Sequence, residues 1–306
     1  KVLWQAIHSI QIQYPTVMCA VYACDEVSVK NLLDNISRTF YIDLLPNLEL
    51  ICLDGVRFIQ PESYPRFTIL FQSLGSLLLA HEALHKHQPD IFFDTIGFAF
   101  TLPYFKYFGR CLTCCYVHYP TVSSDMLQKV RSQTDTFNNS SAISNSSILT
   151  HGKLLYYRAY GYLYGMAGAT CDVTLVNSTW TKGHIDTIWG HRANAHILYP
   201  PCDTGAFAGL ELTRQRPATH FMICSLGQFR PEKNHACQLR AFKYLLESVT
   251  NVSDATCELH LIGSCRDNED LCRVQQLKRL AEVLEIDKHV KFHIKVPFHE
   301  LLHWLG

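Results

Sequence analysis

The sequence predicts an α/β protein of two domains, and three observations carry this prediction. Short apolar runs alternate with helical patterns along the chain, as they do in parallel βαβ units. The 306 residues are 48% hydrophobic and 18% charged, which suits two globular domains of about 150 residues each. Finally, the run FMICSLGQFRPEKNH at 221–235 places a strand, a glycine, a basic turn and a helix in succession, the order of a phosphate site.

The first domain is expected to extend over residues 1–200, and its apolar spacing predicts the elements in order. Helices are expected at 1–14, 27–39, 66–87 and from Asn177 onward, and strands at 17–23, 48–53, 90–94, 111–117, 171–176 and 195–199. The first of these elements is a helix. Because a Rossmann-like domain opens on a strand and a Gly-rich turn, we expect such a segment to precede Lys1 in the natural protein.

Two aromatic segments of the first domain allow two interpretations. They are FAFTLPYFKYF at 98–108 and KLLYYRAYGYLY at 153–164. Their apolar side chains belong either to the domain core or to a patch that lies against a bilayer. Five tyrosines within nine residues of the second segment favour a partly wet environment over a dry core.

Two consecutive prolines, Pro200 and Pro201, end the last strand of this domain and suit a hinge, since proline stops helix and strand alike. A second domain is therefore expected over 201–306, after a polar linker at 204–217. Its elements are expected as strands at 221–226, 257–262 and 290–294 and helices at 236–249, 270–284 and 297–305.

The turn after Gly227 is the strongest candidate for a binding site. The helix that follows offers unpaired backbone N–H groups and roughly half a positive charge, to which Arg230 and Lys233 add two full charges. The alternative is an ordinary strand-to-helix turn whose charges are solvated.

His118 is the second candidate, because it follows the strand at 111–117 directly. In open α/β sheets, ligands bind at the carboxyl ends of the strands. The alternative is a purely structural histidine. Asp125 lies at the start of an expected helix that opens at Ser123 or Ser124. We therefore interpret it as a capping or first-turn residue in preference to a catalytic residue.

The composition argues against several classes of function. A formal net charge of zero gives no basic face for nucleic acid. Thirteen cysteines, an odd number placed mostly in apolar runs, indicate reduced thiols. The C-x-x-C of Cys111 and Cys114 lacks a second pair at zinc spacing, and we see no convincing D-x-D, so no metal site is expected. The sequence contains no run of 18 or more apolar residues, the length that would indicate a membrane-spanning helix.

GQFRPEKNH, together with YVHYPTVSSDML at 116–127, resembles a known family. The resemblance is to the retaining nucleotide-sugar glycosyltransferases of the GT-B type, in which two Rossmann-like domains face each other across a cleft. More narrowly, the text resembles the GDP-mannose-dependent α-1,2-mannosyltransferases that extend dolichyl-diphosphate oligosaccharides. One position departs from the wider family, which carries arginine where this chain has Gln228.

The resemblance implies a function: transfer of mannose from GDP-mannose onto Man(3)GlcNAc(2)-PP-dolichol with retention, for protein N-glycosylation. It implies no metal or other cofactor, a place on the cytosolic face of the endoplasmic reticulum membrane, and other mannosyltransferases of the pathway as further partners. It also implies roles for individual residues. His118 and Lys233 would be catalytic; Gly227, Arg230 and Lys233 would bind the donor diphosphate; and Asn177, Ser178, Pro201 and Asp203 would form turns on the donor side of the cleft.

The resemblance spans nearly the whole chain but omits a piece at each end. The paired glutamates that hold the donor in this family would lie beyond Gly306, so the second domain is expected to be incomplete. Two alternatives stay open. One is a related lipid-linked transferase with another donor or acceptor, and the other is a non-catalytic scaffold that binds a nucleotide sugar.

Overall fold

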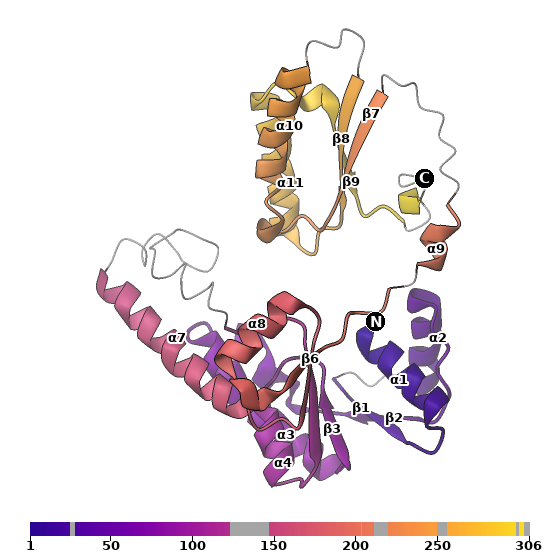
Figure 1. Cartoon of the computed structure of the whole chain (residues 1–306), viewed down its shortest axis with the longest axis vertical. Helices are drawn as coiled ribbons and strands as arrows, with labels where there is room; N and C mark the ends of the chain where they lie inside the picture. Colours follow the sequence, from indigo (N-terminus) through magenta and orange to yellow (C-terminus); the bar gives the residue numbers. More distant parts are fainter. Residues whose placement is uncertain are drawn as a thin grey trace. The chain divides into compact units, whose positions relative to one another are not determined.

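The computed structural model describes residues 1–24, 28–122, 147–202, 204–210, 220–249, 256–297 and 300–302. The chain divides into two compact units, which we call unit 1 (Lys1–Cys202) and unit 2 (Asp203–Gly306). Each unit is an α/β structure with parallel strands (Figure 1). Pro200 and Pro201 lie just before the division. Asp203 is outside the described residues.

Unit 1 contains the expected elements, each within two residues of its predicted bounds. The helices are α1 (Val2–Gln13), α2 (Val29–Phe40), α3 (Thr68–Lys86), α4 (Thr101–Tyr107), α7 (Ser147–Gly168) and α8 (Thr179–Ile188). The strands are β1 (Cys19–Ala23), β2 (Leu48–Cys52), β3 (Ile91–Asp94), β4 (Leu112–Val117), β5 (Val173–Val176) and β6 (Ala195–Ile197). Two of the helices, α4 and α7, cover the aromatic segments, for which periodicity alone predicted no element.

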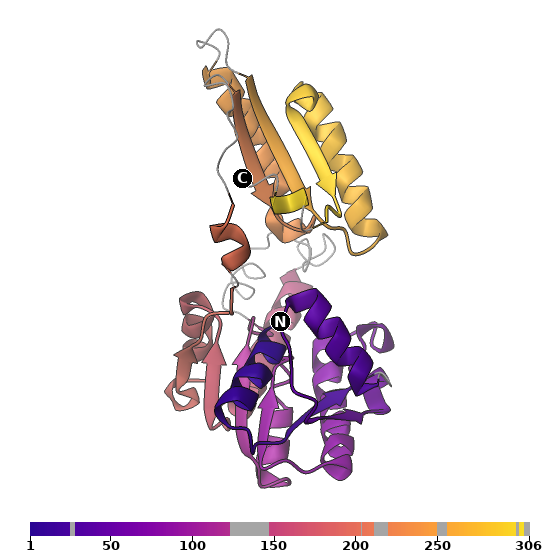
Figure 2. The same cartoon turned by 90° about the vertical axis from the view of Figure 1, so that its right-hand side faces the viewer.

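The strands of unit 1 form two parallel sheets. β1 pairs with β2, and a second sheet has the order β3-β4-β5-β6. In the four-stranded sheet, Cys115 lies opposite Thr174, and Val117 opposite Val176. The carboxyl ends of β4 and β5 therefore lie side by side, which places the residues that follow them at one edge of the sheet (Figure 2).

The tyrosine-rich helix α7 divides between core and surface, so the expected partly wet environment holds on one side, where Tyr162 is 70% exposed. Tyr157, Tyr160 and Tyr164 are buried against β4, β5 and α8. The hydroxyl groups find partners inside the unit: Tyr160 shares a 2.8 Å hydrogen bond with Ser73 of α3, and Tyr156 accepts one from the Leu70 backbone at 3.3 Å. Burial raises the pKa of Tyr160 to about 12. A tyrosine whose hydroxyl is paired can thus line a dry core.

The segment at 98–108 also divides between core and surface. Pro103 lies in the first turn of α4, where a missing N–H group costs nothing. Leu102 and Phe105 are fully buried, while Tyr107 and Phe108 are exposed. The predicted core interpretation holds for the inner face of α4, and an exposed aromatic pair remains at its end.

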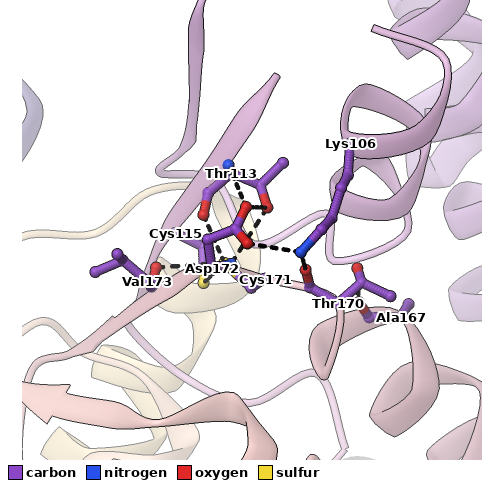
Figure 3. Close-up of polar contacts among 8 residues, drawn as sticks. All are labelled: Lys106, Thr113, Cys115, Ala167, Thr170, Cys171, Asp172 and Val173. Atoms are coloured by element: carbon purple, nitrogen blue, oxygen red, sulfur yellow. Dashed lines mark hydrogen bonds and ion pairs between the residues drawn. The ribbon is translucent and has the colours of Figure 1, made fainter. Parts of the chain in front are cut away.

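A network of polar contacts joins β4, β5 and α4 at the amino ends of the strands (Figure 3). The Asp172 carboxylate accepts hydrogen bonds from the Thr113 backbone at 2.9 Å, from the Thr113 hydroxyl at 3.0 Å and from the Lys106 ammonium at 2.6 Å. Beside this network, the buried thiols of Cys171 and Cys115 lie 3.6 Å apart. The network lies at the opposite end of the strands from His118 and fixes the register of β4 and β5.

Unit 2 is a three-stranded parallel sheet of order β7-β8-β9, covered on one face by two helices (Figure 1). Its elements are α9 (Gly205–Ala208), β7 (His220–Leu226), α10 (His235–Val249), β8 (Thr256–Gly263), α11 (Asn268–Val283) and β9 (Val290–Ile294). The short helix α9 falls within the stretch expected to be a linker, a correction to that prediction. Of the helix expected at 297–305, the structure describes a helical stretch at 300–302.

Candidate functional site

The turn between β7 and α10 contains the elements that the sequence predicts: a glycine after the strand, a short basic turn and a helix start. Gly227 ends β7, a single 3-10 turn spans Pro231–Lys233, and α10 begins at His235. A side chain added at Gly227 would meet only the aliphatic part of Lys233, at 3.6 to 3.8 Å. The fold of unit 2 therefore does not force a glycine here. What the glycine does is leave open space beside the Lys233 side chain, where a ligand can approach the backbone.

This turn rests on the next strand-to-helix turn of unit 2. The Gly227 N–H donates to the Ile262 backbone carbonyl at 3.0 Å, and the Phe229 N–H donates to the Ser264 backbone carbonyl at 3.1 Å. A Cβ atom at Gly263 would lie 2.0 Å from the Gly227 carbonyl oxygen, so only glycine allows the two backbones to approach this closely. Gly263 therefore fixes the position of the turn that follows Gly227, although it does not belong to it.

An ion-pair network around the buried Asp270 carboxylate supports the same turn. The Arg273 guanidinium donates to the Phe229 carbonyl at 3.0 Å and to the Asp270 carboxylate at 2.7 Å. Asp270 is fully buried and also accepts from the Arg266 side chain at 2.9 Å. The Arg266 guanidinium holds the pKa of Asp270 well below its usual range. Because these charged hydrogen bonds are directional, they restrain the Phe229 carbonyl and with it the turn.

The two cations of the turn differ in their surroundings. Lys233 is exposed, and within the described part of the chain no acidic side chain pairs with its ammonium group. The Arg230 guanidinium lies 3.7 Å from the Glu232 carboxylate, which offsets part of its charge. Lys233 is therefore the better placed of the two to face an anion.

His235, the first residue of α10, adds a third group to this site. Its side chain is buried, and its Nδ1 atom has no hydrogen-bond partner in the described structure. Burial lowers the pKa of His235, with further contributions from the nearby charges of Lys233 and Arg273. The imidazole is therefore neutral at neutral pH, and the positive charge of the turn rests on its lysine and arginine.

In unit 1 the structure brings His118 and Asn177 together at the carboxyl ends of β4 and β5. His118 is exposed, and the Asn177 side-chain amide donates to its backbone carbonyl at 2.8 Å. The Asn177 carbonyl oxygen accepts from the Thr181 hydroxyl at 2.6 Å, so its orientation is fixed. Burial of part of the imidazole lowers the pKa of His118. Asn177 thus holds the backbone that carries His118.

Ser178 and Pro201 occupy structural positions next to this edge. The Ser178 hydroxyl caps α8 by accepting from the Thr181 N–H at 3.1 Å, a typical contact of serine at a helix start. Pro201 follows β6 in irregular backbone. Asp203 and Asp125 lie outside the described residues, so the structure gives neither a position. The His118 group belongs to unit 1 and the Lys233 group to unit 2.

The cysteines of this chain lie mostly in or beside the packed elements of the two units. In the described structure no disulfide joins any two of the thirteen cysteines. Burial raises the pKa of Cys114 to about 11, as for an unreactive thiol. Among the described residues, no three His, Cys, Asp or Glu side chains converge as metal ligands would. None of the helices in the described ranges is both long and apolar enough to cross a bilayer.

Sequence reasoning overlooked several residues that the structure places at the two sites. Gly263 ends an apolar run, which is the same signal that marked Gly227, and it could have been found on that basis. The contacts of Arg273, Asp270 and His235 depend on tertiary packing, and no local pattern reveals them.

Comparisons with known proteins identify relatives of this chain. A family model described as ALG11 mannosyltransferase N-terminus matches residues 1–189. A mouse protein named GDP-Man:Man(3)GlcNAc(2)-PP-Dol alpha-1,2-mannosyltransferase is 42% identical over the whole chain, and its human counterpart is also 42% identical. The Xenopus laevis protein of the same name is 44% identical over 98% of the chain. The chain spans 62% of the length of each of these relatives.

Solved structures support the fold. The structure of Anabaena Alr3699/HepE in complex with UDP aligns with 97% of this chain and 67% of its own, with a TM-score of 0.56 and 14% sequence identity. A trehalose-6-phosphate synthase studied with bisubstrate glycomimetics aligns with 94% of this chain and 74% of its own, with a TM-score of 0.57 and 11% identity. The fold is therefore of the GT-B glycosyltransferase type. Because the family model covers more than half of the sequence, the chain belongs to the ALG11 mannosyltransferase family.

Proposed function

We propose that the full-length protein transfers mannose from GDP-mannose, in α-1,2 linkage and with retention, to Man(3)GlcNAc(2)-PP-dolichol. One observation carries the proposal: Lys233 lies beside Gly227 in a braced turn and has no acidic partner among the described residues. The names of the mouse, frog and human relatives, which match nearly the whole chain, support this donor and acceptor.

The proposed chemistry follows from the charge of the turn. When the bond between mannose and GDP breaks, negative charge grows on the departing diphosphate. The Lys233 ammonium, the N-terminus of α10 and, to a lesser degree, Arg230 stabilise that charge. The turn is fixed in advance by Gly263 and Arg273, so little reorganisation is needed during the reaction. We propose that this charge serves the departing group without a metal or other cofactor.

His118 has a different proposed role. Its pKa is lowered by burial, so the imidazole is neutral at neutral pH and can both donate and accept a hydrogen bond. We assign it the orientation of a sugar hydroxyl rather than nucleophilic attack. The contact between Asn177 and the His118 carbonyl supports this assignment, because it holds the histidine in one position.

A dolichol-linked acceptor requires the protein to work at a membrane surface, and we propose the cytosolic face of the endoplasmic reticulum. The exposed face of α3 supports the membrane contact: Phe71, Leu74 and Leu78 follow one another at helical spacing and are each more than 40% exposed. Apolar side chains in such a stripe suit the interfacial region of a bilayer.

The test compares two lysine variants of the full-length protein in detergent, with labelled GDP-mannose and a trimannosyl lipid-linked acceptor. Lys233→Ala is expected to lower turnover by about a hundredfold, the scale for the loss of one preorganised charged donor. Lys243→Ala is the control, since that lysine lies in α10 and pairs with Glu247 at 3.5 Å. Unchanged turnover in Lys233→Ala would remove the phosphate role.

The same assay separates the competing functions. Transfer from another nucleotide sugar, but not from GDP-mannose, would assign a different donor. If the wild-type protein binds GDP-mannose and transfers nothing to any acceptor, the scaffold function replaces the enzyme.

A further inference from the structure

Two aromatic side chains stand exposed beside His118. Tyr119 follows it directly, and Trp180 lies in the first turn of α8. Their rings stack with centroids 5.3 Å apart and planes inclined at 29°. Tyr119 is 58% exposed and Trp180 44%. Of the three tryptophans in the described residues, Trp180 is the most exposed, since Trp4 is half-buried and Trp189 buried.

Buried neighbouring residues restrain the positions of Tyr119 and Trp180. Val117 and Pro120, on either side of the His118-Tyr119 step, are both buried, so this step is anchored at both ends. The Trp180 ring contacts the largely buried His184 ring edge-on, with centroids 4.1 Å apart. Trp180 therefore backs one face of Tyr119 on a capped helix, and these two rings form a preformed surface rather than mobile side chains.

The chemistry of this surface suits a pyranose ring. A hexopyranose presents a patch of C–H groups on one face and hydroxyl groups around its rim. The C–H patch packs on an aromatic face, and the hydroxyls require donors and acceptors nearby. Here the aromatic pair supplies the face, and the Tyr119 hydroxyl supplies a polar group at its border. Small-ligand sites typically combine apolar rings with a small number of precisely placed polar groups.

Other occupants fit less well. A polyprenyl chain would gain nothing from the polar groups beside the rings, and two side chains offer too small an apolar area for a stable protein interface. The position also favours a sugar, because the carboxyl ends of β4 and β5 are where a ligand of an α/β sheet binds.

We propose that Tyr119 and Trp180 form a sugar subsite that holds a mannosyl ring of the acceptor oligosaccharide. The proposal rests on the proposed function for the identity of the sugar, and it adds the residues of this chain that recognise it. The subsite lies at the same end of β4 and β5 as the backbone contact between Asn177 and His118.

The kinetic test uses the full-length protein in detergent. Trp180→Ala and Tyr119→Ala are each expected to raise the KM for the trimannosyl lipid-linked acceptor about tenfold, the scale for the loss of one stacked ring. The KM for GDP-mannose should not change. Tyr119→Phe retains the ring and should keep most of the acceptor affinity. Tyr244→Ala, which removes a tyrosine that is 73% exposed on α10, is the matched control.

A binding test does not depend on activity. A soluble α-linked mannotriose is titrated into the wild-type protein and into Trp180→Phe while tryptophan fluorescence is recorded. A saturable change in the wild type that is absent from Trp180→Phe supports the subsite, even if no mannose transfer is detected, so the two proposals can fail separately. Unchanged acceptor KM in both alanine variants, or equal fluorescence changes in the wild type and Trp180→Phe, would overturn the subsite.

Discussion

Replacing Gly263 by alanine tests whether the second turn of unit 2 fixes the phosphate turn. The new Cβ atom would lie 2.0 Å from the Gly227 carbonyl oxygen and 2.8 Å from its carbon, whereas ordinary contacts begin near 3.4 Å. Both neighbours are backbone atoms, so no side chain can rotate away. The Gly227 backbone must therefore retreat by more than about 1 Å, a displacement that can cost a hundredfold in rate even when it arises away from the reacting atoms.

We expect Gly263→Ala to lower kcat/KM for GDP-mannose by about a hundredfold, equivalent to roughly 2.7 kcal/mol of transition-state stabilisation. The assay is initial-rate mannose transfer by the full-length protein, with GDP binding measured by calorimetry and folding by circular dichroism. Gly161→Ala is the control, because a Cβ at that helical position meets nothing within 4 Å. A folded Gly263→Ala protein with wild-type kinetics and GDP affinity would refute the reasoning.

Two further predictions concern unit 1. Burial lowers the pKa of His118, so the imidazole of the folded protein should titrate below about 6.5. The titration is followed by NMR, and the signal is assigned by its loss in His118→Gln. A midpoint above 6.5 would contradict this prediction. The neutral imidazole therefore persists to lower pH than in an unfolded chain, and any stability cost of its protonation appears only as the pH falls below 6.5. Asp172→Asn weakens the charged hydrogen bonds to Lys106 and Thr113, so amide hydrogen exchange in β4 and β5 should accelerate about tenfold or more. The control is Asp186→Asn, which breaks an ion pair with Lys182 within α8 and should change the exchange rate little. Equal exchange rates in the two variants would show that the network does not hold the strands.

The elements of both units follow from local patterns in the sequence. Strands such as Leu112–Val117 are apolar runs of strand length, and α8 begins at a serine whose hydroxyl caps it, so their bounds can be read from the chain. The aromatic segments depend on contacts between distant parts of the chain. Tyr160 looks unsuited to a dry core until Ser73, 87 residues away, is seen to pair with its hydroxyl.

The order of strands and helices follows from the sequence, as does the presence of a glycine, a lysine and a helix start in the turn after β7, because these lie within a few residues of one another. How that turn is held is set by the tertiary structure. Gly263 and Arg273 contact it from 36 and 44 residues away. It also decided that Tyr119 and Trp180 stack beside His118, since β4 and β5 bring their carboxyl ends together only when the sheet forms. Local patterns record the conformation that a segment prefers, whereas contacts between distant segments arise from packing, which no short stretch of sequence encodes.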